Sequence, residues 1–83
     1  MMAYTYILFS ASLDRFYIGH TETSPEIRLQ KHLSNHSGFT AKAKDWILVW
    51  SKSFDSKSEA FAFERKIKQW KSRKAIENLI RNA

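Results

Sequence analysis

Two short, largely apolar runs near the start of the chain are rich in the β-branched and aromatic residues of strands. They cover residues 4–9 and 15–19, and residues 10–14 between them predict the loop of a hairpin. We predict that Ile7 lies opposite Phe16, which would set Tyr6 directly beside Tyr17. In this register the predicted core face carries Phe9, Ile7, Phe16 and Ile18, and the opposite face carries Tyr4, Tyr6, Tyr17 and Gly19.

The pattern after the hairpin predicts a helix and then a third strand. Residues 23–26 supply an N-cap, a proline at the first helical position and an acid near the positive end of the helix dipole, so the helix should run from about Pro25 to Asn35. Its expected core face is Ile27, Leu29 and Leu33. A polar connection over residues 39–45 follows. Residues 46–50 are apolar without alternation, which favours a central strand covered on both faces.

Two further helices complete the pattern. Ser56 and Glu59 match a capping box, which predicts a helix that ends near Trp70, and Ser72 is placed to cap a last helix. The expected core positions are Ala60, Phe63, Ile67 and Trp70, widened by Phe61, and then Ala75, Ile76, Leu79 and Ile80. The element order is β-β-α-β-α-α. No repeat, linker or low-complexity tract divides residues 1–83, so a single domain is expected.

Composition adds a basic surface to this picture. The 83 residues are 43% hydrophobic, as in an ordinary globular domain, and the absence of cysteine excludes disulfides and thiolate metal sites. Neither a leader peptide nor a membrane span is evident, so a cytoplasmic protein is expected. The net charge is +6, and residues 42–83 carry eleven Lys or Arg against five Asp or Glu. This balance suits a polyanionic partner, although solvated helix faces would give the same excess of charge.

Five residues form a candidate catalytic series: Tyr6, Tyr17, Arg28, His32 and Glu64. Together they supply phenols, a guanidinium, an imidazole and a carboxylate, the groups that a metal-assisted phosphodiesterase needs. Each also has a plainer interpretation. The tyrosines would form a stabilising cross-strand pair, the helical Arg and His would be solvated, and Glu64 would pair with Lys68 one turn later.

The order and spacing of these residues resemble the single-domain branch of the GIY-YIG endonuclease superfamily over nearly the whole chain. The half-motifs fall on residues 4–6 and 17–19, with the helical Arg and His and then the Glu following in order. Tyr4 and Thr5 stand where the family usually has Gly and Ile, and Ile76 stands where an asparagine is common. The resemblance implies an α+β fold in which a small three-stranded antiparallel sheet is flanked by helices.

The resemblance also implies a mechanism. Glu64 would be the sole protein ligand of one Mg²⁺ or Mn²⁺ ion, which keeps most of its waters, and Arg28 would hold the phosphoryl oxygens. We expect Tyr6 to be the base, oriented by Tyr17 and His32. Since a free phenol has a pKa of about 10, His32 or Tyr17 remains an alternative base.

The implied partner is DNA, with branched or nicked DNA as candidate shapes and RNA as an alternative. Candidate nucleic-acid contacts are Gly19, Lys31, Arg65, Lys68, Lys71, Arg73 and Lys74. Gly19 would let a ligand backbone approach, or would be a simple turn residue. Family members generally draw target choice from attached domains, so either the shape of the nucleic acid or a protein partner would supply it here. Oligomeric state is open. Two other hypotheses are a non-catalytic nucleic-acid-binding module and a basic protein that binds an acidic protein partner.

Overall fold

The computed structural model describes residues 2–34 and 37–82. Within them the chain follows the predicted order β-β-α-β-α-α, with one short 3-10 helix added before the third strand. The elements are β1 (Ala3–Ser10), β2 (Arg15–Thr21), α1 (Pro25–Ser34), η1 (Phe39–Lys42), β3 (Ile47–Phe54), α2 (Lys57–Trp70) and α3 (Arg73–Arg81). The predicted end of the first helix, Asn35, lies outside the described residues.

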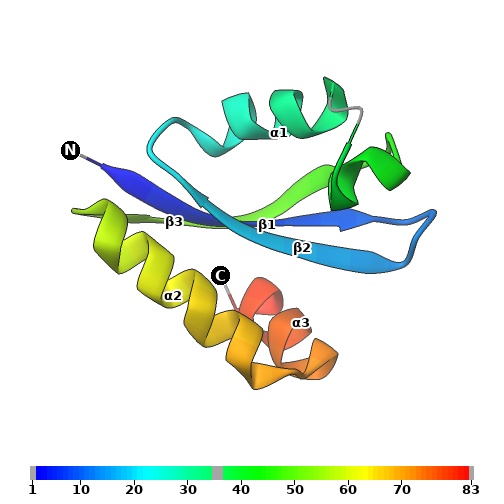
Figure 1. The fold of residues 1–83 in the computed structure, drawn as a ribbon. Coiled ribbons are helices and arrows are strands. Elements are labelled where there is room, and N and C mark those ends of the chain that lie inside the picture. Colours follow the sequence, from blue (N-terminus) through cyan, green and yellow to red (C-terminus); the bar gives the residue numbers. More distant parts are fainter. Residues whose placement is uncertain (1, 35–36, 83) are drawn as a thin grey trace.

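The three strands form one antiparallel sheet with helices on both faces. Helix α1 covers one face, and α2 and α3 cover the other (Figure 1). The strand order is β2-β1-β3, so the prediction that the third strand is central was wrong. Strand β1 takes the centre because its inner residues Thr5, Ile7 and Leu8 are fully buried, whereas Ile47 on β3 is 56% exposed.

The hairpin register differs from the predicted one by two residues. Ile7 pairs with Ile18 and Phe9 pairs with Phe16, so Tyr6 lies opposite Gly19 and not opposite Tyr17. Because Ser10 pairs with Arg15, residues 11–14 form the connection, in which Asp14 adopts a left-handed conformation (φ 54°) and donates its N–H to Ala11 O at 3.3 Å. A shift of two residues keeps every side chain on its predicted face.

The sheet separates two apolar clusters. On the α1 side, Tyr6, Leu8, Ala43 and Trp46 pack with Tyr17, Leu29 and Leu33. On the α2 and α3 side, Ile7, Ile18, Trp50 and Ile67 pack with Phe16, Phe63, Trp70 and residues of the last helix. The predicted separation of the hairpin's apolar face from its tyrosine face is therefore correct.

Local signals placed the helix starts correctly. The Ser24, Ser56 and Ser72 hydroxyls each accept from a backbone N–H three residues later, all at 3.2 Å. Ile27 was predicted to lie on the core face of α1, and this was wrong, because Ile27 is 51% exposed. The helix turns His32 toward the sheet instead, where a buried hydrogen bond to Tyr6 compensates the loss of its hydration.

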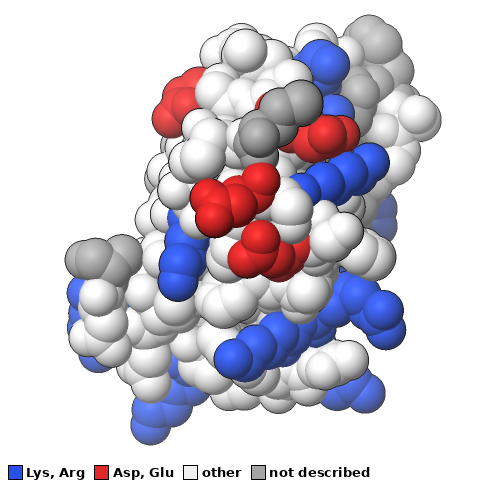
Figure 2. All heavy atoms as spheres, turned by 90° about the vertical axis from the view of Figure 1, so that its left-hand side faces the viewer, with Lys and Arg blue, Asp and Glu red and all other residues white. Residues whose placement is uncertain are grey.

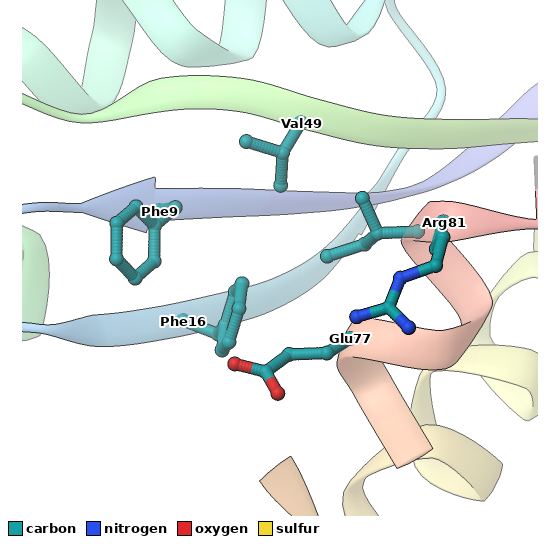
Figure 3. A pocket seen from close by; sticks show the side chains of 6 residues that line it. Phe9, Phe16, Val49, Glu77 and Arg81 are labelled. Carbon is teal, nitrogen blue, oxygen red and sulfur yellow. The ribbon is translucent and has the colours of Figure 1, made fainter. Parts of the chain in front are cut away.

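An open apolar hollow of about 270 Å³ lies between the sheet and α3. Figure 3 shows Phe9, Phe16 and Val49 on the strands, with Glu77 and Arg81 on the helix. Phe9 and Phe16 form the cross-strand pair of this face, with ring centroids 5.0 Å apart. The hollow lies on the sheet face opposite to Tyr6, so it is separate from the predicted catalytic residues.

No helix within residues 2–34 and 37–82 is long and apolar enough to cross a membrane.

Candidate active site

A buried hydrogen-bonded chain joins β1, α1 and η1. The Tyr6 hydroxyl lies 2.8 Å from His32 Nε2, and His32 Nδ1 lies 2.9 Å from the Thr40 hydroxyl. Tyr6, His32 and Thr40 are 1%, 3% and 3% exposed. Thr40 is a participant that the sequence analysis missed, because it lies in a segment without periodicity. Both imidazole nitrogens therefore have partners, which fixes the orientation of the ring.

Tyr17 and Arg28 border this chain. The Tyr17 ring lies edge-on to His32 with centroids 4.8 Å apart, and it lies diagonally from Tyr6 at 6.4 Å. Arg28 projects from the same helix as His32, one turn earlier. Its Nε is buried without a hydrogen-bond partner among the described residues. Such a donor is expensive to leave unpaired, and it marks a place where an anion would be stabilised.

The electrostatics keep both members of the Tyr6–His32 pair neutral near pH 7. Burial raises the pKa of Tyr6, and the Arg28 guanidinium beside its hydroxyl partly offsets that rise. Burial lowers the pKa of His32, and the positive charge of Arg28 lowers it further. Since a neutral imidazole carries one N–H, donation from Nδ1 to Thr40 leaves Nε2 free to accept the Tyr6 proton.

Glu64 lies on α2, with its side chain only 9% exposed. One carboxylate oxygen lies 2.6 Å from His20 Nδ1, and the other accepts from Lys68 Nζ at 2.7 Å. The predicted Lys68 pair is therefore present, but it accounts for only half of the interactions of Glu64. His20 was missed. The signal was available, since His20 directly follows Gly19 in β2 and must point to the opposite face of the sheet.

The site is divided by edge strand β2. Helices α1 and α2 lie on opposite faces of the sheet (Figure 1). The α1 side carries Tyr6, Tyr17, Arg28 and His32, and the α2 side carries His20 and Glu64. Gly19 and His20 are the neighbouring β2 residues at which the halves meet, because Tyr6 lies opposite Gly19. The Glu64 charge also contributes to the raised pKa of Tyr6, so the two halves are within electrostatic range.

The residues present fit a weakly coordinated divalent cation better than a dedicated metal cage. Among residues 2–34 and 37–82, no cluster of three or more His, Cys, Asp or Glu side chains could hold a metal ion. Magnesium is commonly held by one or two carboxylates together with waters and substrate phosphate. Glu64 fits that role once the half-exposed Lys68 releases its oxygen.

The predicted nucleic-acid contacts differ in their surroundings. Lys31, Lys71 and Lys74 are exposed, and the Arg65 guanidinium lies 5.8 Å from the Phe61 ring. Arg73 pairs with Asp14 at 2.7 Å and with Glu77 at 3.1 Å, so it also joins α3 to the hairpin. These contacts remain predictions.

Figure 2 shows that charge is unevenly distributed at the end of the molecule where α2 begins. Acidic side chains gather in the middle of this end, and basic ones surround them. The basic groups are most frequent on the lower side, where Figure 1 places α2 and α3.

Comparison with known proteins assigns the chain to a family. The family model described as the GIY-YIG catalytic domain matches residues 2–78. The chain belongs to the GIY-YIG family. The fold is also similar to the solution NMR structure of a UPF0213 protein from Bacillus halodurans, with 33% identity and a TM-score of 0.59, covering 96% of this chain and 83% of that one. A search of curated proteins found no match.

Membership in the GIY-YIG family makes this a nuclease-type domain, and nucleic acid is the substrate class of such domains. The predicted family and α+β fold are thereby confirmed. The roles of the individual residues remain predictions.

The glycine of the second GIY-YIG half-motif makes room for the tyrosine of the first. A Cβ at Gly19 would lie 2.6 Å from the Tyr6 hydroxyl oxygen and 2.7 Å from Cζ. We expect Gly19→Ala to displace the Tyr6 hydroxyl from His32 and to lower the free energy of unfolding by about 1–3 kcal/mol. Chemical denaturation and the imidazole NMR signals of His32 would measure the two effects.

Gly38→Ala is the control for this substitution. A Cβ there meets no atom within 4 Å, and only the positive φ of 88° opposes it. It should therefore destabilise the domain without moving the His32 signals. Unchanged His32 signals in Gly19→Ala would contradict the packing role given to Gly19.

Burial of His32 predicts an acid-sensitive fold. Its folded-state pKa lies below the ordinary value of 6.5, so the unfolded chain takes up the proton first as the pH falls. The associated stability is complete above pH 6.5 and is lost as the pH falls below it toward the folded-state pKa. The free energy of unfolding, measured by chemical denaturation, should fall more between pH 8 and pH 5 in the native chain than in His32→Gln. Equal losses would assign the acid sensitivity to other groups.

Proposed function

We propose that this GIY-YIG domain is a divalent-metal-dependent endonuclease that hydrolyses phosphodiester bonds of DNA. The observation that carries the proposal is the buried Nε of Arg28, which has no hydrogen-bond partner in the described part of the chain and lies beside the Tyr6–His32 hydrogen bond. It provides an anion-binding donor next to a pair able to move a proton. Glu64, on the other side of β2, adds the carboxylate that a cation needs.

Arg28 would hold the scissile phosphate. A guanidinium can donate forked hydrogen bonds to two phosphoryl oxygens, and its charge opposes the negative charge that develops there during transfer. Because Nε has no hydrogen-bond partner among residues 2–34 and 37–82, a phosphate oxygen that reached this atom would satisfy it. Binding would thus remove a cost already present in the folded domain.

Tyr6 and His32 would activate the attacking water. As the water oxygen attacks phosphorus, Tyr6 would take a proton from the water and pass its own hydroxyl proton to His32 Nε2, 2.8 Å away. The P–O bond to the leaving sugar oxygen breaks as the new one forms, and that oxygen takes a proton from solvent. The Thr40 hydroxyl accepts from His32 Nδ1 and stabilises the imidazolium that forms. In this relay Tyr6 never persists as a phenolate, which its raised pKa would disfavour.

Glu64 would hold Mg²⁺ or Mn²⁺ together with waters and a phosphate oxygen. The bound ion supplies charge stabilisation at the leaving oxygen. His20 keeps one carboxylate oxygen oriented by its 2.6 Å contact, which is the role that partners of metal-binding carboxylates commonly have. Lys68 is 52% exposed and is free to exchange its contact with Glu64 for one with DNA.

The test is cleavage of labelled linear, nicked, flapped and four-way-junction DNAs with Mg²⁺, with Mn²⁺ and with chelator. We expect metal-dependent cutting that Arg28→Ala abolishes while the variant remains folded. Arg81→Ala, an exposed arginine on α3, is the matched control and should cut normally. DNA binding without cutting under all metal conditions would instead identify a non-catalytic binding module, and absence of both binding and cutting would refute a role on DNA.

A further inference from the structure

Phe61 is exposed although its place beside the apolar stripe of α2 predicts a core residue. Its side chain is 43% exposed, so the expectation that it fills the core was wrong. Together with His20, Lys57 and Ser58 it lines an open hollow of about 260 Å³. Since drug-sized ligands occupy sites of about 300–1,000 Å³, the hollow suits a smaller planar group.

The surroundings of the Phe61 ring suit a nucleobase. The His20 ring lies beside it with centroids 4.9 Å apart, and the Arg65 guanidinium lies 5.8 Å from its centroid. An exposed aromatic ring with a cation beside it is the usual platform for the bases of single-stranded nucleic acid. Lys57 lines the same hollow, and it makes a long, exposed contact of 3.6 Å with Glu22.

The hollow adjoins the candidate metal-binding carboxylate. His20 lines the hollow and also contacts Glu64 at 2.6 Å. Phe61 and Glu64 are three residues apart on α2, so they are neighbours on its surface. A nucleotide whose phosphate lies at Glu64 would therefore have its own or its neighbour's base within reach of Phe61.

We propose that the hollow beside Phe61 binds one unpaired nucleobase of the substrate strand, next to the phosphate that is cut. The proposal rests on the proposed function, which it deepens by naming a substrate class: DNA with an unpaired nucleotide beside the cleavage position. A base inside a continuous duplex is stacked on both sides and has no free face for the Phe61 ring. Lys57 and Arg65 contact the flanking phosphates.

The experiment measures DNA binding without metal, so that it does not depend on cleavage. Fluorescein-labelled flapped DNA and a continuous duplex of the same sequence are titrated with the native chain, Phe61→Ala, Phe61→Leu and Phe61→Trp. We expect Ala and Leu to weaken binding of the flapped DNA about 5- to 100-fold, the value of one stacked base, and to change duplex binding less than about twofold. Phe61→Trp should restore binding, with added tryptophan fluorescence that the flapped DNA quenches.

Ile47→Ala is the control, because Ile47 is an exposed apolar residue on β3 and has no place in the hollow. It should bind both DNAs as the native chain does. Phe61→Leu keeps apolar area without a ring, so binding equal to that of the native chain would overturn the proposal. Equal losses on flapped and duplex DNA, or no DNA binding by the native chain, would overturn it as well. If the native chain binds but never cuts DNA, only the proposed catalytic function fails, and selective loss in Phe61→Ala still supports the base site.

Discussion

Glu64→Gln is expected to lower metal-dependent cleavage by about 10³-fold, the size of losing one charge-stabilising group in an active site. Glutamine has the shape of glutamate but lacks the negative charge that would hold the cation. It also leaves His20 and Lys68 facing a neutral amide in place of a carboxylate. Single-turnover cleavage over a range of Mg²⁺ and Mn²⁺ concentrations measures the effect.

Glu77→Gln is the matched control. Glu77 also accepts from a basic residue one helical turn away, Arg73 at 3.1 Å, but it lies on α3. Its substitution should leave the cleavage rate unchanged. DNA binding and thermal unfolding of both variants separate loss of chemistry from loss of structure. Metal-dependent cleavage by Glu64→Gln within about tenfold of the native rate would exclude Glu64 as the essential metal ligand.

The features that could be predicted from the sequence are those fixed by neighbours in the chain. Ser56 and Ser72 cap helices because each hydroxyl accepts from an N–H three residues later. The two faces of the hairpin follow from alternation, which survives the two-residue error in register. The family resemblance rested on the order of a few polar residues, and it was correct because these residues occupy the expected elements.

The features that were missed depend on contacts between distant segments. His20 and Glu64 are 44 residues apart, so strand alternation places His20 on the α2 face of the sheet but does not indicate its hydrogen bond with Glu64. Ile27 is the more apolar side chain, yet α1 buries His32, because Tyr6 and Thr40 supply partners for both imidazole nitrogens. The uninterrupted apolar run at residues 46–50 indicated a central strand. Its apolar character instead reflects Leu48 and Trp50, which pack into opposite clusters from an edge strand, and Trp46, which packs just before that strand begins.

Tyr6→Phe is the second substitution with a large expected effect. Removing the hydroxyl eliminates the group that would take the proton from water, and general acid–base catalysis of this kind contributes about 10²- to 10⁴-fold. The ring remains and continues to fill the cluster around Leu8 and Trp46. Because His32 Nε2 loses its buried partner, the free energy of unfolding should also fall, by about 1–3 kcal/mol. Tyr4→Phe, on the same strand and the same face, is the matched control and should cut DNA at nearly the native rate.

The pH profile then distinguishes Tyr6 from His32 as the base. In the relay, His32 must be neutral to accept the Tyr6 proton, and its pKa lies below 6.5, so native cleavage should hold down to pH 6.5 and decline as the pH falls further. His32→Gln should lose this decline, because no imidazole is then left in the relay to be protonated, and should cut more slowly than the native chain at pH 7. Tyr6→Phe should lose most of the rate at every pH. The opposite result would be an inactive His32→Gln and a Tyr6→Phe variant that keeps both the native rate and its decline at low pH. His32 would then be the base, and Tyr6 would only orient it.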